Sequence, residues 1–184
     1  MAPRIEMKGL FFVYLALSLL FVPVKWFVSW IAAAIFHELC HLLALRCFRC
    51  KIVGIKIGIT GAVITSAPAT NVAALICEAA GPVGSMLLLL LSRIAPTVAI
   101  CGFIQGVFNL LPLYPLDGSK ILDRFLSLLL SEKHRCITMR VIRYVTVSVL
   151  LICGVFLYQM SLGPIPLLIV LILSWNSRKN SLQK

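Results

Sequence analysis

Long apolar runs separated by short polar segments dominate the chain. A helix needs about 20 apolar residues to cross the hydrocarbon core of a bilayer, so each such run predicts a membrane span. Six runs qualify, of which the first and the last are short: Leu10–Val24, Trp26–Leu45, Asn71–Leu91, Val98–Leu111, Val141–Met160 and Leu162–Trp175. We therefore predict an all-α polytopic membrane protein with about six transmembrane helices.

Two segments between the runs have patterns of their own. In Ile52–Thr65, isoleucines alternate with polar residues or glycine, and Gly61 offers a turn, which predicts a small β-hairpin between the second and third spans. In Ser119–Ser131, the apolar residues share one helical face, which predicts an amphipathic helix lying on the membrane surface.

The composition agrees with a membrane protein, because 61% of the 184 residues are apolar and only 12% are charged. Lys8 before the first run would also suit a signal peptide, but no small-residue cleavage site precedes Lys25. No linker is long enough to separate a second domain. We expect a single membrane-embedded domain over residues 1–184, without a soluble regulatory domain.

The net charge of +11 could indicate nucleic-acid binding, but the positions of the basic residues offer another explanation. If the N-terminus is cytoplasmic, only Lys25 and Arg93 fall outside, and the other fifteen of the 17 lysines and arginines fall inside. Cytoplasmic loops of membrane proteins carry such an excess of lysine and arginine, and these residues are attracted to anionic lipid headgroups. We expect both termini in the cytoplasm, contact with the lipid bilayer, and no nucleic-acid partner.

The seven cysteines lie in predicted spans or on the cytoplasmic side, where thiols stay reduced, so no disulfide framework is predicted. Cys47 and Cys50 have the spacing of zinc ligands. Because no second such pair follows, we favour ordinary packing for them.

The sharpest chemical signal is the sequence HELCH at His37–His41, inside the second apolar run. Histidines four residues apart project from one helical face, where two imidazoles can bind the same tetrahedral zinc ion. Glu38 next to the first histidine can act as general base by taking a proton from water that zinc has made more acidic. The motif therefore predicts a catalytic metal site.

A coincidental polar cluster facing the bundle interior is the other interpretation. The chain has only three histidines and six acidic residues, yet three of these ionisable groups fall within five positions of one membrane helix. Burying them there costs several kcal/mol unless a bound metal offsets that cost. We therefore favour the metal site.

A zinc site needs at least one further protein ligand. Most candidates lie in the N-terminal tail, in the cytoplasmic loop or on the polar side of the amphipathic segment: Glu6, Asp123, Glu132 and His134. Glu78 and Asp117 are the acids closest to membrane depth. We prefer Asp117, because prolines and a glycine around it must break the fourth span, and non-helical backbone at that depth is tolerated where it lines a site. An ordinary loop at the end of a span is the alternative.

Three motifs resemble those of a known family. HELCH at His37–His41, followed by NLLPLYPLDG at Asn109–Gly118, resembles the site-2 protease family of intramembrane zinc proteases, and AGP at Ala80–Pro82 is similar to its small-residue motif. The resemblance is strongest to the compact bacterial branch that includes the sporulation factor processing a sigma-factor precursor. The motifs cover the catalytic core, about residues 36–118.

The resemblance implies roles for two further residues. Asp117 would be the third zinc ligand, and Asn109 would help to place the substrate or stabilise the oxyanion. The hairpin at Ile52–Thr65 would lie near the active-site entrance. Ser119 stands where a second glycine is common in the family, and Ser85 stands where an asparagine often follows the Gly-Pro pair.

The third span contains other residues with open roles. Glu78 could be protonated, pair with an arginine or lie behind the metal ligands, and we favour a structural role. Small residues let membrane helices approach closely, which explains Gly81, Gly84 and Ser85 by packing alone.

We therefore predict a zinc metalloendopeptidase with one zinc ion per chain. It would hydrolyse a peptide bond in or near a transmembrane segment of a membrane-bound protein, such as a sigma-factor precursor or similar regulator, and it could have a membrane regulatory partner. The alternatives are a zinc transporter, although the first, fifth and sixth spans offer almost no polar path, and an inactive membrane scaffold, against which only the intact Glu38 argues.

Overall fold

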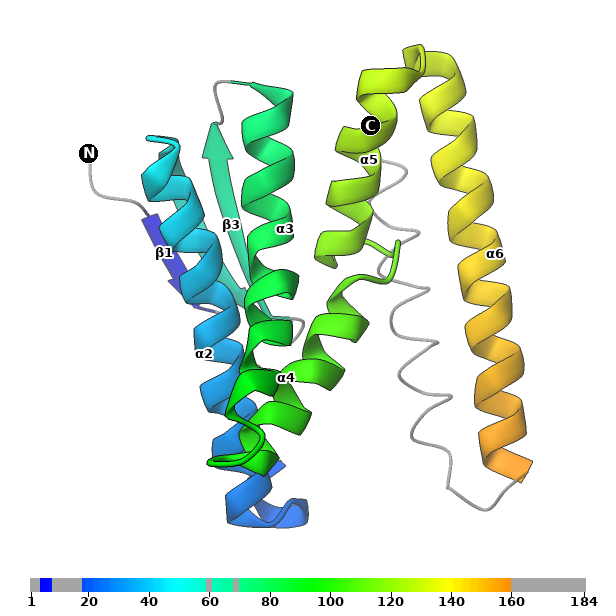
Figure 1. The fold of residues 1–184 in the computed structure, drawn as a ribbon. Coiled ribbons are helices and arrows are strands. Elements are labelled where there is room, and N and C mark those ends of the chain that lie inside the picture. The colour runs from blue at the N-terminus through cyan, green and yellow to red at the C-terminus, as the bar shows by residue number, and fades with distance from the viewer. Residues whose placement is uncertain (1–3, 8–17, 59–60, 68–69, 160–184) are drawn as a thin grey trace. The chain divides into compact units, whose positions relative to one another are not determined.

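The computed structural model describes residues 4–7, 18–58, 61–67 and 70–159. The predicted first span lies mostly, and the predicted sixth span entirely, outside these residues. The chain divides into two compact units, Met1–Asn109 and Leu110–Lys184, and each is described by itself (Figure 1).

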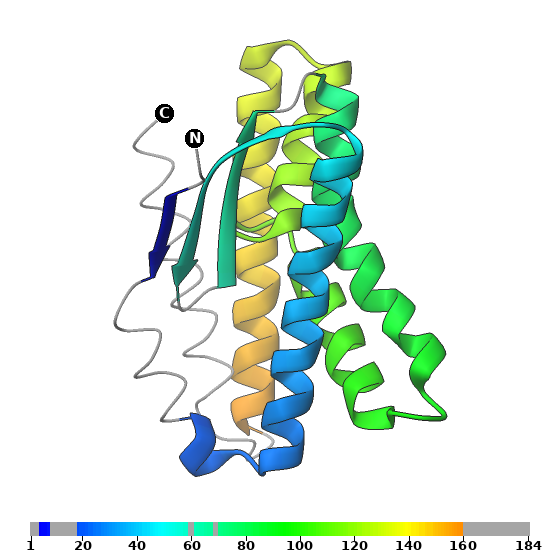
Figure 2. The same ribbon diagram turned by 90° about the vertical axis from the view of Figure 1, so that its left-hand side faces the viewer.

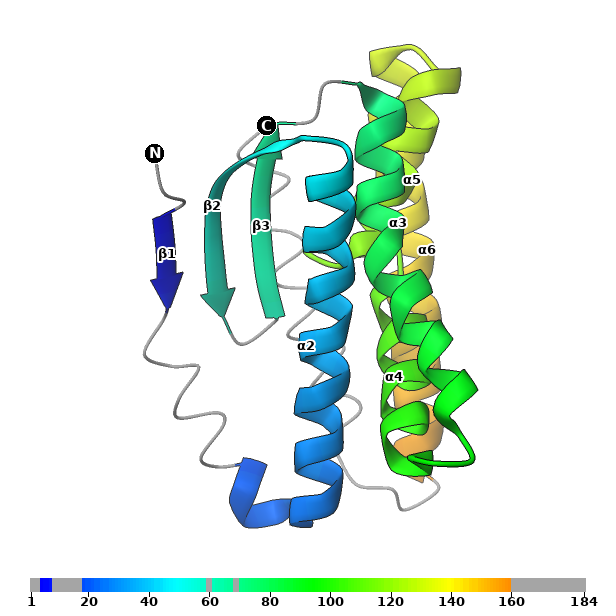
Figure 3. The same cartoon turned by 60° about the vertical axis from the view of Figure 1, so that its left-hand side comes forward.

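The first unit contains a three-stranded sheet in the order β1 (Arg4–Met7), β2 (Lys51–Gly58) and β3 (Gly61–Ala67). β2 and β3 pair antiparallel with Ile55 opposite Ile64, in the interval where the sequence predicts a hairpin. β1 pairs parallel to β2 and was not predicted, because its four residues show no alternation long enough to reveal a strand. β2 and β3 lie side by side next to α2 (Figure 2), with β3 the nearer strand (Figure 3).

Helix α2 spans Val24–Cys47 and contains the predicted second span. It ends in a left-handed turn at Arg49, whose φ is 53°. The N–H of Cys50 donates to the carbonyl of Leu45 at 2.9 Å, closing the six-residue loop that terminates many helices. The turn leads the chain directly into β2.

Helix α3 spans Asn71–Leu87 and continues as the 3₁₀ helix η1, Leu88–Leu91, as predicted for the third span. The Thr70 hydroxyl caps its start by accepting the N–H of Ala73 at 3.1 Å. Helix α4, Pro96–Asn109, follows and ends three residues before Pro112, which cannot continue a helical ladder.

The buried face of α2 is one line of residues spaced four apart: Ser29, Ala33, His37, His41 and Leu45. Ala33 packs against Leu88 and Cys101, which brings α2 against η1 and α4. Ser29 donates a hydrogen bond to Thr97 at 3.0 Å. The two histidines therefore lie on the face of α2 that the rest of the unit covers.

The second unit contains helices α5, Asp117–Leu129, and α6, Glu132–Gln159. Leu113 and Leu116 before α5 pack against Val147 and Leu150 of α6. Helix α5 is the predicted amphipathic segment, beginning two residues earlier than Ser119.

The fifth span was predicted to begin at Val141, but α6 begins nine residues earlier, at Glu132. Its 28 residues extend about 42 Å at the usual helical rise. The helix is therefore longer than the roughly 30 Å hydrocarbon core. The apolar run Val141–Met160 indicates the part that can cross the membrane, but not the residue at which the helix starts.

Among the described residues, three helices are long and apolar enough to cross a membrane: Val24–Cys47, Asn71–Leu91 and Glu132–Phe156. α4 is apolar but has only 14 residues. A membrane protein is thus supported, while the count of six spans stays a prediction.

Candidate metal centre

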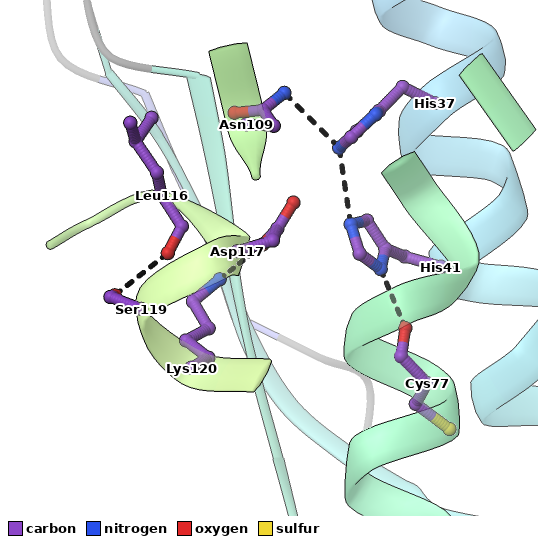
Figure 4. Close-up of polar contacts among 8 residues, drawn as sticks. All are labelled: His37, His41, Cys77, Asn109, Leu116, Asp117, Ser119 and Lys120. Carbon is purple, nitrogen blue, oxygen red and sulfur yellow. Dashed lines mark hydrogen bonds and ion pairs between the residues drawn. The ribbon is translucent and has the colours of Figure 1, made fainter. Parts of the chain in front are cut away.

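His37 and His41 form the centre of the site in the first unit. Because they are four residues apart on α2, both project from its covered face, and they are only 2% and 8% exposed. Their Nε2 atoms lie 3.2 Å apart, and the ring planes meet at 78°. Figure 4 shows the rings in a chain of polar contacts from Asn109 to the Cys77 carbonyl.

The outer nitrogen of His41 fixes the protonation pattern of that ring. His41 Nδ1 lies 2.7 Å from the backbone carbonyl oxygen of Cys77 on α3. A carbonyl can only accept a hydrogen bond, so Nδ1 carries a proton, and in a neutral ring Nε2 then presents a lone pair. Pro82 on α3 has no N–H to donate to the carbonyl of Glu78, so the helical hydrogen-bond ladder is interrupted one residue after Cys77.

The outer nitrogen of His37 also has a partner on α3. His37 Nδ1 lies 2.8 Å from the Ser85 hydroxyl oxygen, and Ser85 is fully buried. The sequence pattern alone predicts a packing role for Ser85. Its position one helical turn after Gly81 in an apolar span was the signal for a further role, because a buried hydroxyl needs a hydrogen-bond partner.

The two Nε2 atoms have the spacing expected of zinc ligands. Nitrogens bonded to one tetrahedral zinc at about 2.0–2.1 Å lie about 3.3 Å apart, close to the 3.2 Å found between these atoms. A Cβ atom at Gly81 would fall 2.1 Å from His41 Nε2 and 2.7 Å from His37 Nε2. Glycine at position 81 therefore keeps the space beside both nitrogens clear, and these residues fit a zinc ion.

Asn109 and Glu38 lie beside the histidines in the same unit. Asn109 is the last residue of α4, and its Nδ2 lies 3.5 Å from His37 Nε2, a long contact. Glu38 follows His37 on α2 and is half-buried. The structure therefore brings four predicted site residues, His37, Glu38, His41 and Asn109, into one unit of the protein.

Asp117 belongs to the second unit, where it begins α5 and is 7% exposed. Its carboxylate forms an ion pair with Lys120 at 2.8 Å, and the Ser119 hydroxyl donates to the Leu116 carbonyl in the same turn (Figure 4). A Cβ atom at Gly118 would meet the backbone of Leu110, so the turn needs glycine there. All three predicted ligands, His37, His41 and Asp117, are thus buried.

Two other predicted candidates gain no role in the described residues. Glu78 is half-buried on α3, next to the Cys77 carbonyl that contacts His41, and its structural role stays a prediction. Cys47 and Cys50 are free thiols at the end of α2.

Gly84 lies against the Cys40 side chain and so serves close packing of α3 on α2, as predicted.

Comparison with known proteins gives the family. The sequence model of peptidase family M50 matches residues 61–153, half of the chain. This stretch contains Asn109 and Asp117, and the HELCH segment precedes it. No curated protein matches the chain.

The fold resembles a solved structure, the site-2 protease from Methanocaldococcus jannaschii, with a TM-score of 0.67 and 23% sequence identity. The alignment covers 95% of this chain and 89% of that one. At this identity the likeness is evidence for the fold. Together with the family match over half of the sequence, it leads to one conclusion: the chain belongs to peptidase family M50, a family of membrane metalloproteases.

Proposed function

We propose that this protein is a zinc endopeptidase that cleaves a peptide bond in or near a transmembrane segment of another membrane protein. We also propose that it works as one catalytic domain with its core at about residues 36–118. The observation that carries the proposal is the convergence of His37 Nε2 and His41 Nε2 at 3.2 Å. His41 Nδ1 contacts the Cys77 carbonyl and His37 Nδ1 contacts the Ser85 hydroxyl. The two Nε2 atoms therefore remain close enough together to bind one cation.

We propose Asp117 as the third zinc ligand. Two imidazoles and one carboxylate are a common protein donor set for catalytic zinc, and they leave the fourth position for water or substrate. Asp117 is buried at the first turn of α5, where the helix dipole stabilises a carboxylate. Its ion pair with Lys120 offsets part of the cost of burying that charge.

The proposed reaction divides the work among two side chains and the metal. When bound, zinc supplies a Lewis acid that polarises the scissile carbonyl and makes a water molecule more acidic. Glu38 accepts the proton from the attacking water and delivers it to the leaving amine. The Asn109 amide, which reaches to 3.5 Å from His37 Nε2, donates a hydrogen bond to the substrate carbonyl oxygen as negative charge develops there.

The sheet offers a way to present the substrate. A transmembrane helix hides its own peptide bonds, so the substrate must unwind near the scissile bond. β2 is paired on both sides, with β1 and with β3, whereas the other side of β3 has no partner strand among the described residues. We propose that an extended substrate segment pairs with β3, and that the substrate is a membrane-bound regulator such as a sigma-factor precursor.

The test of this function is zinc-dependent cleavage by the purified full chain. We expect the protein in detergent to cut synthetic transmembrane peptides internally, with new termini identified by mass spectrometry. A chelator should stop the reaction and added Zn²⁺ should restore it. His37→Ala should be inactive, whereas His134→Ala, a matched change at an exposed histidine, should keep the parent rate. Cleavage that persists without zinc would contradict the proposal.

We also propose six spans with both termini in the cytoplasm, supported by the fifteen-to-two division of Lys and Arg. A fluorescent protein fused after residue 184 should fluoresce, and alkaline phosphatase fused at Arg93 should be active. An active phosphatase at residue 184 would refute this topology.

A further inference from the structure

The two histidines are held by partners of different chemical kinds. His41 Nδ1 contacts a backbone carbonyl of α3, whereas His37 Nδ1 contacts the Ser85 hydroxyl at 2.8 Å. The carbonyl fixes the His41 tautomer whatever the side chain of Cys77 is. The His37 tautomer depends on a side chain, and a hydroxyl can either donate or accept.

Zinc binding through His37 Nε2 requires one of these two arrangements. The Nε2 lone pair is free for a metal only if Nδ1 carries the proton, and Nδ1–H then donates to the Ser85 oxygen. In the opposite tautomer the Nε2 atom carries a hydrogen directed at His41 Nε2, 3.2 Å away, where it would occupy the space of the metal. An acceptor at position 85 therefore favours the form of His37 that binds zinc.

Packing does not explain the hydroxyl of Ser85. The residue is fully buried between α3 and α4, where a Cβ atom at Gly106 would lie 3.1 Å from the Ser85 Cβ. Alanine would fit this space equally well and would avoid burying a polar group. The hydroxyl oxygen instead contacts His37 Nδ1, and this hydrogen bond explains why a serine rather than an alanine suits the position.

We infer that Ser85 is a positioning residue of the metal centre. It accepts the His37 Nδ1–H hydrogen bond, holds the ring in the tautomer and orientation that present Nε2 to zinc, and thereby sets zinc affinity. The inference rests on the proposed zinc site. Hydrogen-bond partners behind metal ligands typically contribute about 10–100-fold in metal affinity.

The experiment compares the zinc affinity of full-length variants in detergent by competition with a chelator. Ser85→Ala should bind Zn²⁺ about 10–100-fold more weakly than the parent, and Ser85→Thr, which keeps the hydroxyl, should remain close to the parent. Ser29→Ala is the matched control, because it removes another buried α2-interface hydroxyl that contacts Thr97 and no ligand. Its affinity should be unchanged.

A spectroscopic readout separates positioning from general damage. The chain has three histidines, so ¹⁵N-histidine spectra are simple to assign with the His134→Ala variant. The zinc-loaded parent should show His37 protonated at Nδ1, and Ser85→Ala should lose the protection of that proton from exchange with water.

Each remaining outcome decides the matter. If Ser85→Ala bound Zn²⁺ as tightly as the parent, or if Ser85→Ala and Ser85→Thr lost zinc affinity equally, the role of the hydroxyl would be overturned. The proposed zinc site itself would not be. A parent spectrum with His37 protonated at Nε2 would overturn it without any variant. A parent that binds no Zn²⁺ would overturn both this inference and the proposed function.

Discussion

Glu38→Gln should retain zinc and lose cleavage. Glutamine keeps the size and hydrogen-bonding capacity of the side chain but cannot accept a proton from water, and positioned acid–base catalysis is typically worth about 10²–10⁴-fold. Glu38 is half-buried on α2 beside His37 but is not proposed to bond the metal. The measurement is the cleavage rate of a transmembrane peptide together with zinc content per chain, which should stay near one.

Two comparisons make this result specific. Glu132→Gln makes the same change at an exposed glutamate at the start of α6, and it should cleave at the parent rate. Glu38→Gln cleaving at nearly the parent rate would refute Glu38 as the general base, whatever the metal content. Loss of zinc along with activity would instead make Glu38 part of the metal centre.

Asp117→Ala should lose both zinc and cleavage. Removing one of three protein ligands leaves two imidazoles, too few for the usual coordination of a catalytic zinc. The variant also leaves the Lys120 ammonium without the carboxylate that it contacts at 2.8 Å. Zinc content after dialysis and peptide cleavage are measured on the same preparation.

Asp123→Ala is the matched control for this ligand. It removes an aspartate from the same helix, one that is partly exposed and lies 3.6 Å from Arg135. This variant should retain zinc and activity, because a surface ion pair contributes little to stability. A full complement of zinc in Asp117→Ala would move the third ligand elsewhere, with Glu78 the next candidate.

Local patterns in the sequence determined the helices and the chemistry that they carry. The apolar run Trp26–Leu45 lies within α2, and Asn71–Leu91 is reproduced by α3 with η1, because hydrophobic length and helical hydrogen bonding act over short stretches of chain. The four-residue spacing of His37 and His41 likewise required only helical geometry to place both imidazoles on one face.

Two features of the fold are not evident from the sequence pattern. β1 pairs with β2 across more than forty intervening residues, and nothing in its four residues predicts that pairing. The early start of α6 was missed because the charged residues from Glu132 onward lack the hydrophobicity of a span but still form helix readily.

The partners of the two histidines were decided by tertiary structure alone. Cys77 contributes a backbone carbonyl, which no side-chain pattern can reveal, and Ser85 reaches His37 across 48 positions of sequence. Gly81 looked like a packing residue, but its missing Cβ keeps the space between the imidazoles open. A helix pattern can place ligands on a face, whereas the tautomer and orientation of each ring depend on whichever helix packs against that face.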